Sequence, residues 1–271
     1  MTQSIMVVKL GGTEGVDFSA ICQDVAALLA QGRRLVLVHG GSAEANQLGE
    51  AVGYPPRFIT SPSGYTSRYT DRRTLEIFIM AVNGKVNSLL VEQLQRLGVN
   101  ALGIGGFDGR VLEAARKDTI QSVENGKRKI IRDDYTGKIE KVNTRLLTLL
   151  LDHGYLPVIA PLAVSAAGEA LNVDADRAAA MVAAALQAET LILLTAVPGL
   201  MKKFPDETTL IRNLPRLKLD EALTFAEGRM KKKILGAQEA LQGGAGRVII
   251  GDGRIGSPIS NALAGKGTVI E

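Results

Sequence analysis

Short apolar runs rich in valine and isoleucine alternate along the chain with stretches of helical periodicity. Residues 4–12 ("SIMVVKLGG") and 33–41 ("RRLVLVHGG") each have the pattern of a buried strand that ends in two glycines. Helical spacing follows each run, over 17–32 and 42–52, and Ser42 is expected to cap the second helix. This strand–helix–strand–helix order predicts a parallel sheet covered by helices.

The alternation continues through the rest of the chain. Further strands are predicted at 99–106, 155–161, 189–195 and 246–252, and further helices at 71–97, 142–153, 174–187 and 228–242. Gly84 is a candidate break in the longest of these helices. Two polar, turn-rich stretches, 107–138 and 162–171, are compatible with hairpins. No linker, low-complexity segment or internal repeat interrupts the pattern.

The composition excludes several classes of protein. Among 271 residues, 46% are hydrophobic, which indicates a large core and argues against a disordered chain. A single cysteine, Cys22, excludes an internal disulfide framework, and two histidines exclude a three-histidine metal site. No run of 18 apolar residues and no signal peptide is evident, so we predict a cytoplasmic protein that does not bind membranes.

Glycine pairs at the ends of predicted strands indicate an anion site. Gly11–Gly12 and Gly40–Gly41 follow consecutive strands and precede helices. Ligands of open parallel sheets bind beyond the carboxyl ends of the strands, where glycine lets backbone N–H groups approach a phosphate. Ordinary turn chemistry is the alternative for either pair alone. The usual nucleotide motifs, G-x-x-x-x-G-K-[ST] and G-x-G-x-x-G, are missing from these strand ends.

Charged residues near these glycines are candidates for the same site. Lys9 lies inside a predicted buried strand, where an unpaired lysine is rare, although an edge position would also explain it. Lys231–Lys233 cannot all face one side of a helix, so at most one of them is expected to reach a site. Asp174 is expected to cap a helix, and Asp176 to lie in its first turn, where a carboxylate also favours the helix dipole.

Five motifs, taken together, resemble the amino-acid kinase family over nearly the whole chain. They are "VVKLGG", "VLVHGG", "SRYTDRRTLE", "NVDADRAA" and "GRMKKK", in the family's order and spacing. The segments "HGGSAEAN", "GYPPRF" and "DYTGKIEKVN" are more similar to the carrier-dependent LysW-aminoadipate kinases than to the acetylglutamate kinases. Two departures are Ser42, where acetylglutamate kinases have a third glycine, and Ala196, where their nucleotide loop often has aspartate.

The resemblance implies a fold and two functional regions. The expected fold is α/β, a three-layer α/β/α sandwich around an open, mainly parallel sheet. Residues 1–165 would bind the acyl substrate and residues 166–271 the nucleotide, on one continuous sheet. Relatives of this family commonly form homodimers, so we expect one here.

The resemblance also assigns roles to individual residues. Lys9 and Lys233 would stabilise the transferring phosphoryl group, and Asp176 would orient both lysines. The remaining implied site residues are Gly11 and Gly12 for the phosphoryl group, Gly40 and Gly41 for the reacting end of the substrate, Arg68 and Asn172 for its α-carboxylate end, and Thr195, Val197 and Gly199 for the nucleotide. Arg68 is expected to hold a carboxylate through two parallel hydrogen bonds. Tyr65 and Tyr69 would shape the pocket beside it, with ordinary hairpin packing as the alternative.

The implied activity is ATP-dependent phosphorylation of a carboxylate to an acyl phosphate, with Mg²⁺ brought by ATP. A side-chain carboxylate is ionised at pH 7, so no general base is required. The expected substrate is LysW-linked 2-aminoadipate in lysine biosynthesis, with LysW-linked glutamate also possible. One alternative is N-acetyl-L-glutamate in arginine biosynthesis. A second is a non-catalytic nucleotide-binding protein on the same fold.

The two ends of the chain suggest two further expectations. The last predicted strand lies near the end of the chain, which disfavours an aspartokinase with a regulatory domain. The first predicted strand begins close to Met1, so we expect no amino-terminal helix and no inhibition by arginine.

Basic charge clusters in three segments, although the formal net charge is only +4. Residues 54–73 hold four arginines and one aspartate, residues 109–138 eight basic and five acidic residues, and residues 228–233 four basic residues and no acid. We interpret them as a docking face for the acidic carrier LysW, with Lys127, Arg128 and Lys129 as the central cluster. A solvated surface is the alternative. Nucleic acid is disfavoured, because no binding motif is present and aromatic residues are few.

Overall fold

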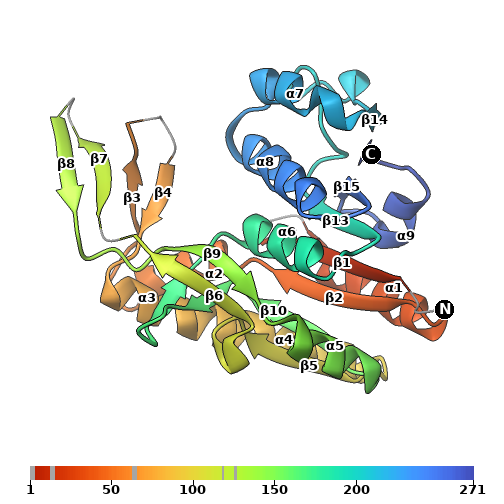
Figure 1. Cartoon of the computed structure of the whole chain (residues 1–271), viewed down its shortest axis with the longest axis horizontal. Helices are drawn as coiled ribbons and strands as arrows, with labels where there is room; N and C mark the ends of the chain where they lie inside the picture. The colour runs from red at the N-terminus through yellow and green to blue at the C-terminus, as the bar shows by residue number, and fades with distance from the viewer. Residues whose placement is uncertain (1–3, 13–15, 63–65, 118, 125–126) are drawn as a thin grey trace.

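An eight-stranded sheet forms the centre of the computed structural model, which describes residues 4–12, 16–62, 66–117, 119–124 and 127–271 (Figure 1). Its strands lie in the order β14-β16-β15-β13-β1-β2-β10-β5. Their bounds are β1 Ile5–Leu10, β2 Arg34–His39, β5 Ala101–Gly105, β10 Leu156–Ala160, β13 Thr190–Thr195, β14 Asn213–Leu214, β15 Arg247–Asp252 and β16 Thr268–Ile270. Every pairing is parallel except that of β15 with β16. The predicted mainly parallel sheet is therefore confirmed.

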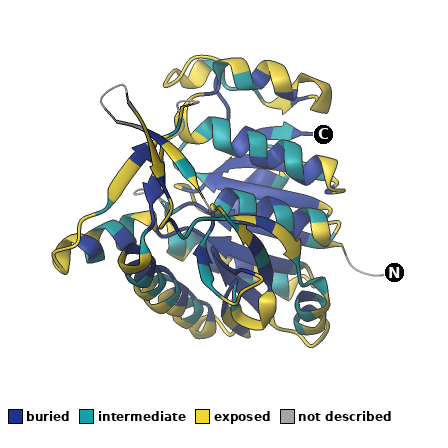
Figure 2. Ribbon diagram, turned by 60° about the vertical axis from the view of Figure 1, so that its left-hand side comes forward, coloured by how far each residue is buried: buried dark blue, intermediate teal, exposed yellow. Residues whose placement is uncertain are grey.

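Helices cover both faces of this sheet. Successive residues of a strand point to opposite faces, so Val7 packs into one hydrophobic core while Met6 and Val8 pack into another. One face carries α5 Thr144–Asp152, α6 Ala175–Ala185, α7 Leu219–Phe225 and α8 Gly228–Gln242, and the other carries α1 Phe18–Ala30, α4 Ser88–Arg96 and α9 Pro258–Leu263. The sheet is buried between these layers, as Figure 2 shows. The three-layer α/β/α architecture is confirmed.

The longest helical stretch is continuous, and a break at Gly84 was the wrong expectation. It consists of α3 Arg72–Phe78, the π-helix η1 Ile79–Asn87 and then α4. By length and composition alone, Arg72–Arg96 would be able to cross a membrane. Leu75 and Leu94 in this stretch are fully buried, which is also the property of a core helix in a folded domain.

Two differences from the sequence prediction concern helix starts and small elements. Helix α2 spans Ser42–Ala51, and its cap position is held by Gly41 without a side-chain hydrogen bond, so Ser42 is not the cap. The second half also contains β14, β16, α7 and α9, which the apolar pattern did not predict. Short 3₁₀ turns cover Asp108–Arg110, Glu207–Thr209 and Arg216–Lys218.

Smaller sheets and two hairpins extend the main body. The strands β6 Leu112–Arg116, β9 Gly137–Val142, β11 Leu162–Val164 and β12 Ala170–Asn172 form a second sheet in the order β12-β11-β6-β9. Two antiparallel hairpins, β3 Arg57–Thr60 with β4 Thr66–Tyr69 and β7 Ile120–Glu124 with β8 Lys127–Ile131, project side by side from the body (Figure 1). The hairpins expected within 107–138 and 162–171 are confirmed as β7–β8 and β11–β12.

Candidate active site

The two glycine pairs meet at the carboxyl edge of the sheet. Strands β1 and β2 pair in parallel, and the N–H of Gly40 donates to the carbonyl of Leu10 at 3.1 Å. A Cβ atom added to Gly12 would lie 2.6 Å from the nitrogen of Gly41. A Cβ on Gly11 would lie 3.0 Å from the carbonyl oxygen of Leu194, near the end of the neighbouring β13. Only glycine at position 12 permits this approach of the two loops, so their N–H groups are gathered in one place.

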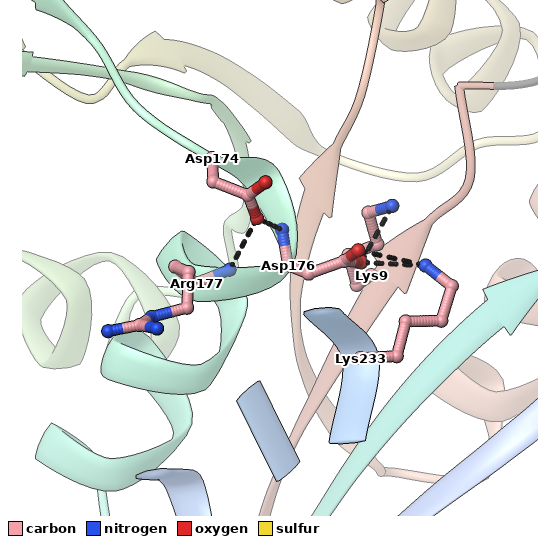
Figure 3. A network of polar contacts seen from close by, with 5 residues as sticks. All are labelled: Lys9, Asp174, Asp176, Arg177 and Lys233. Carbon is pink, nitrogen blue, oxygen red and sulfur yellow. Dashed lines mark hydrogen bonds and ion pairs between the residues drawn. The ribbon is translucent and has the colours of Figure 1, made fainter. Parts of the chain in front are cut away.

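Lys9, Asp176 and Lys233 form a buried triad beside these loops (Figure 3). The Nζ atom of Lys9 lies 2.9 Å from Oδ1 of Asp176. The Nζ atom of Lys233 lies 3.0 Å from Oδ1 and 2.9 Å from Oδ2 of the same carboxylate. The three residues are only 6%, 8% and 5% exposed, respectively. Two ammonium groups share one carboxylate, so the triad carries a net positive charge where an anion would complete it.

Local sequence explains how α6 and α8 position Asp176 and Lys233. Oδ1 of Asp174 accepts from the backbone N–H groups of Asp176 and Arg177 at 2.9 and 3.1 Å, so Asp174 caps α6 as predicted. Gly236 on α8 packs close to the backbone of Asp176, which brings the two helices together near Lys233. Small residues at this crossing therefore let a lysine from α8 reach a carboxylate on α6.

Helical spacing alone does not say which lysine of Lys231–Lys233 faces the site, and the family resemblance implies that it is Lys233. The Nζ atom of Lys232 instead lies 3.5 Å from the carbonyl of Thr66 on β4, whereas Lys233 is buried against Asp176. One lysine of the three therefore reaches the triad.

Burial and the two lysines set the ionisation of Asp176. Burial by itself raises the pKa of the Asp176 carboxyl, but the charges of Lys9 and Lys233 and their hydrogen bonds outweigh it, so this pKa lies well below its usual range. Burial lowers the pKa of Lys233, and the charge of Lys9 acts in the same direction while Asp176 opposes both. The carboxylate is therefore a fixed negative charge at neutral pH.

Arg68 on β4 is held against helix α2 and two aromatic rings. Its Nη2 donates to Oδ1 of Asn46 at 2.5 Å and to the carbonyl of Ser42 at 3.3 Å. Its guanidinium carbon lies 5.4 and 5.9 Å from the ring centres of Phe58 and Phe78. These contacts fix the orientation of a side chain that is only 9% exposed. Asn46 was not among the predicted site residues, because nothing in the neighbouring sequence indicates that it faces the hairpin.

Asn172 lies next to the strand that carries Arg68. Its Nδ2 donates to Oγ1 of Thr70 at 3.1 Å, immediately after β4. The N–H of Thr70 donates to Oδ2 of the fully buried Asp134 at 3.0 Å. The structure thus places the two residues that were expected to bind the α-carboxylate on adjoining elements, and Asp134 holds Thr70, the residue that Asn172 contacts.

Of the two tyrosines considered beside Arg68, the described one packs within the hairpins. The hydroxyl of Tyr69 donates to Oδ2 of Asp133 at 2.5 Å, and the guanidinium of Arg57 stacks on its ring at 4.9 Å. Its ring packs with Ile59 and Ile131 in a small core shared by the two hairpins. Hairpin packing is therefore the role that these contacts give Tyr69, and Tyr65 lies outside the described residues.

The expected nucleotide residues follow β13. Thr195 ends this strand opposite Asp252 of β15, and both Thr195 and Val197 are partly exposed. Gly199 is buried, and a Cβ there would come within 2.7 Å of Oγ1 of Thr268 on β16. Its glycine is thus explained by packing between the loop and β16.

Comparisons with known proteins agree with this geometry. The model of the amino acid kinase family matches residues 4–252. The [LysW]-aminoadipate kinase of Deinococcus radiodurans is 59% identical over 267 residues, which cover 98% of this chain and 91% of that protein. The enzyme of the same name from Thermus thermophilus is 51% identical over 268 residues, 98% of this chain and 100% of that one.

A solved structure shows the same architecture in a longer protein. The N-acetylglutamate synthase of Neisseria gonorrhoeae, complexed with coenzyme A and N-acetyl-glutamate, superposes with a TM-score of 0.79 at 29% identity. The match covers 98% of this chain and 59% of the synthase, so this chain spans about three fifths of that protein. The matched motifs, the three-layer sandwich and these similarities lead to one conclusion: the chain belongs to the amino acid kinase family.

Proposed function

We propose that this protein is an ATP-dependent kinase that phosphorylates the side-chain carboxylate of 2-aminoadipate attached to the carrier protein LysW. The observation that carries the proposal is the buried, net positive triad of Lys9, Asp176 and Lys233 beside the two glycine loops. The names of the relatives at 59% and 51% identity support the substrate.

The chemistry requires no proton transfer from the acceptor. A carboxylate oxygen of the substrate attacks the γ-phosphorus of ATP, a new P–O bond forms, and the bond to the bridging oxygen breaks with release of ADP. The acceptor carboxylate has an ordinary pKa of about 4.3 and is already ionised at pH 7. Lys9 and Lys233 offset the charge on the phosphoryl oxygens in the transition state, and Asp176 keeps both ammonium groups in place.

The roles of the remaining residues are part of the same proposal. N–H groups of the Gly11–Gly12 loop contact the phosphoryl group, and those of Gly40–Gly41 the reacting carboxylate. Arg68 and Asn172 hold the α-carboxylate end. Thr195, Val197 and Gly199 contact the nucleotide. In this proposal residues 1–165 bind the acyl substrate and residues 166–271 bind the nucleotide, and Asn172 of the second region also reaches the acyl substrate.

Mg²⁺ fits this site as a companion of ATP. Within the described ranges, no group of three or more histidine, cysteine, aspartate or glutamate side chains comes close enough to hold a metal. Mg²⁺ keeps much of its water and is often held by nucleotide phosphates, so a dedicated protein cage is not required. Bound in this way, it neutralises phosphate charge beside the two lysines.

The two projecting hairpins form the proposed docking face for the carrier. Arg57 on β3, Arg128 and Lys129 on β8, and Arg132 just after it are exposed there. The hydrophobic side chains of Phe58 and Ile130, 55% and 58% exposed, lie on the same hairpins. Arg68 and Lys233 are buried, so they do not add to the basic face that was predicted from the sequence. An acidic carrier suits this combination of charge and apolar surface.

A homodimer is also part of the proposal. Met80 and Leu89, 48% and 53% exposed, lie on the helical stretch Arg72–Arg96, most of whose other large apolar side chains are covered. Exposed apolar side chains on a core helix are suited to pairing with a second copy. Sedimentation equilibrium tests this, with a monomer as the contradicting result.

Acyl-phosphate formation, trapped with hydroxylamine, tests the activity. The purified protein is given ATP, Mg²⁺ and, side by side, LysW-linked 2-aminoadipate, LysW-linked glutamate or N-acetyl-L-glutamate. We expect the highest kcat/KM on LysW-linked aminoadipate. Glutamate lacks one methylene, which a pocket usually discriminates by only about 1–3 kcal/mol. Preference for N-acetylglutamate would support the first alternative. ATP binding without phosphorylation of any acceptor would support the non-catalytic one.

A further inference from the structure

A buried histidine–asparagine pair lies directly beneath the Gly40–Gly41 loop. His39 is the last residue of β2 and is fully buried, and Asn87 is the last residue of the π-helix and is 4% exposed. Nδ1 of His39 lies 2.8 Å from the carbonyl oxygen of Gly40, and Nε2 lies 2.9 Å from Nδ2 of Asn87. Nδ2 of Asn87 also lies 2.9 Å from the carbonyl oxygen of Val158 on β10.

These contacts determine where the protons are. The carbonyl of Val158 can only accept, so the atom of Asn87 that faces it is the nitrogen. The same nitrogen donates to Nε2 of His39, which must therefore be unprotonated. The single proton of the neutral imidazole is thus on Nδ1, from where it is donated to the carbonyl of Gly40.

This hydrogen bond sets the direction of the next N–H group. In a trans peptide the C=O and N–H point in opposite directions across one plane. The carbonyl of Gly40 points inward to His39, so the N–H of Gly41 points away from the core. A Cβ atom on Gly12 would lie 2.6 Å from the nitrogen of Gly41. This nitrogen therefore faces the other glycine loop.

We propose that His39 and Asn87 are positioning residues that hold the Gly40–Gly41 peptide with the Gly41 N–H directed at the reacting carboxylate and phosphoryl group. The proposal rests on the function proposed above and deepens it. An N–H fixed before the reaction needs no reorganisation when charge develops, which is the property that makes such donors effective.

The absence of a side chain at Gly103 leaves space for the amide of Asn87. A Cβ on Gly103 of β5 would lie 2.0 Å from Oδ1 of Asn87, so a side chain there would displace the amide. A Cβ on Gly41 would lie 2.9 Å from a methyl group of Val82, which is also on the π-helix. The π-helix, a feature that is frequent at functional sites, thus supports the loop through both Val82 and Asn87.

The first test separates the donor from the ring. His39→Leu removes the Nδ1 donor, whereas the amide nitrogen of His39→Asn occupies nearly the same place and can still donate. We expect His39→Leu to lower kcat/KM for the carrier-linked substrate by about 100-fold, as for loss of one oxyanion donor, with KM for ATP within about 2-fold. His39→Asn should recover most of the lost activity. Activity of His39→Leu near that of the wild type, or no recovery in His39→Asn, overturns the proposal.

A second set of variants approaches the pair from the other side. Asn87→Leu and Gly103→Ala should lower kcat/KM as His39→Leu does, since the first removes the amide that fixes the imidazole and the second displaces it. Gly84→Ala is the matched control on the same π-helix, because a Cβ there meets no atom closer than 4.0 Å. Equal losses in Gly84→Ala, or losses that only follow the folded fraction measured by circular dichroism, would show a purely structural role.

A crystal structure of His39→Leu tests the peptide orientation without reference to activity. We expect the Gly40 carbonyl to lose its inward direction and the Gly41 N–H to turn away from Gly12. An unchanged peptide overturns the inference even if the wild type is fully active. A wild-type protein that phosphorylates no acceptor would overturn the proposed function instead, and the peptide orientation in the variant would still decide the role of His39.

Discussion

The Nζ atom of Lys233 lies 3.0 and 2.9 Å from the two carboxylate oxygens of Asp176, and Lys9 reaches the same carboxylate. One buried carboxylate on α6 thus pairs with two ammonium groups, one from β1 and one from α8. Such an arrangement is stable only while the carboxylate remains ionised, and its excess positive charge is available to an anionic ligand.

Replacing either lysine should reduce catalysis more than binding. For Lys9→Ala and Lys233→Ala we expect kcat to fall by roughly 100- to 1000-fold with a much smaller change in KM for ATP, because each removes a contact that strengthens in the transition state. Lys266→Ala, an exposed lysine before β16, is the control and should be unaffected. Steady-state kinetics checks this, and a near-normal kcat in either variant would remove that lysine from the mechanism.

Neutralising Asp176 should destabilise the fold. Asp176→Asn leaves two buried ammonium groups facing each other, and breaking a buried ion pair costs about 3–5 kcal/mol. The pKa of Asp176 is depressed, so its stabilisation is fully present above the ordinary aspartate pKa of about 3.9 and is lost as the pH falls towards the lower folded-state pKa.

Urea unfolding of the wild type and of Asp176→Asn at several pH values measures this difference. The gap in unfolding free energy should be constant near neutral pH and should narrow in acid. A gap that widens as the pH falls would contradict the assignment of the charge to Asp176.

His39 should make the stability of the protein sensitive to mild acid. Burial, followed by the charge of Lys9, lowers the pKa of His39 from about 6.5 to about 4, despite its bond to Gly40. The unfolded chain therefore binds a proton first, and the stability that is present above pH 6.5 is lost as the pH falls towards 4. Between pH 7 and 4.5 this loss is on the order of 2–3 kcal/mol. His39→Asn lacks the titrating group, so equal pH dependence in variant and wild type would refute the prediction.

Changing Arg68 to lysine should weaken binding of the acyl substrate and leave binding of ATP unchanged. A point charge replaces the planar fork, and the contacts with Asn46 and the two phenylalanine rings are lost with it. We expect KM for the carrier-linked substrate to rise about 10-fold or more, with KM for ATP unchanged. Arg145→Lys, on the exposed face of α5, serves as the control. If ATP binding suffered instead, Arg68 would belong to the nucleotide side of the site.

Association with the carrier should depend on salt and on the β7–β8 hairpin. Opposite charges raise the association rate, so KM for the carrier-linked substrate should increase several-fold from low to moderate ionic strength. Arg128→Glu with Lys129→Glu should reproduce the high-salt behaviour at low salt. Arg33→Glu with Arg96→Glu carries the same charge change at the opposite, amino edge of the sheet. Identical kinetics in the two double variants would show that the hairpin is not the docking face.

The layered architecture of this protein is readable from local patterns in the amino-acid sequence. A buried strand is recognisable from its own residues, since every residue from Met6 to Leu10 is apolar except Lys9. The start of a helix is recognisable in the same way, and Asp174 caps α6. That one lysine, and the glycines after it, mark the carboxyl edge because charge and close backbone approach are both unusual there. The resemblance to a known family rests on these same local signals. Small elements such as β14 and α9 escaped notice because too few residues carry a periodic pattern.

Which side chains contact each other in the site depends on the tertiary structure. By spacing alone Lys231, Lys232 and Lys233 are equivalent, and although the family resemblance singles out Lys233, its contact with Asp176 depends on the packing of α8 on α6. Asn46 and Asn87 carry no local sign of their roles, because each acts on a residue that is distant in sequence and adjacent only after folding. The sequence gives the chemical type of each side chain, whereas the direction in which a side chain points depends on the rotation of its helix and on the space that neighbouring residues leave. Hydrogen bonds of buried groups follow from that geometry, and so does the chemistry of the site.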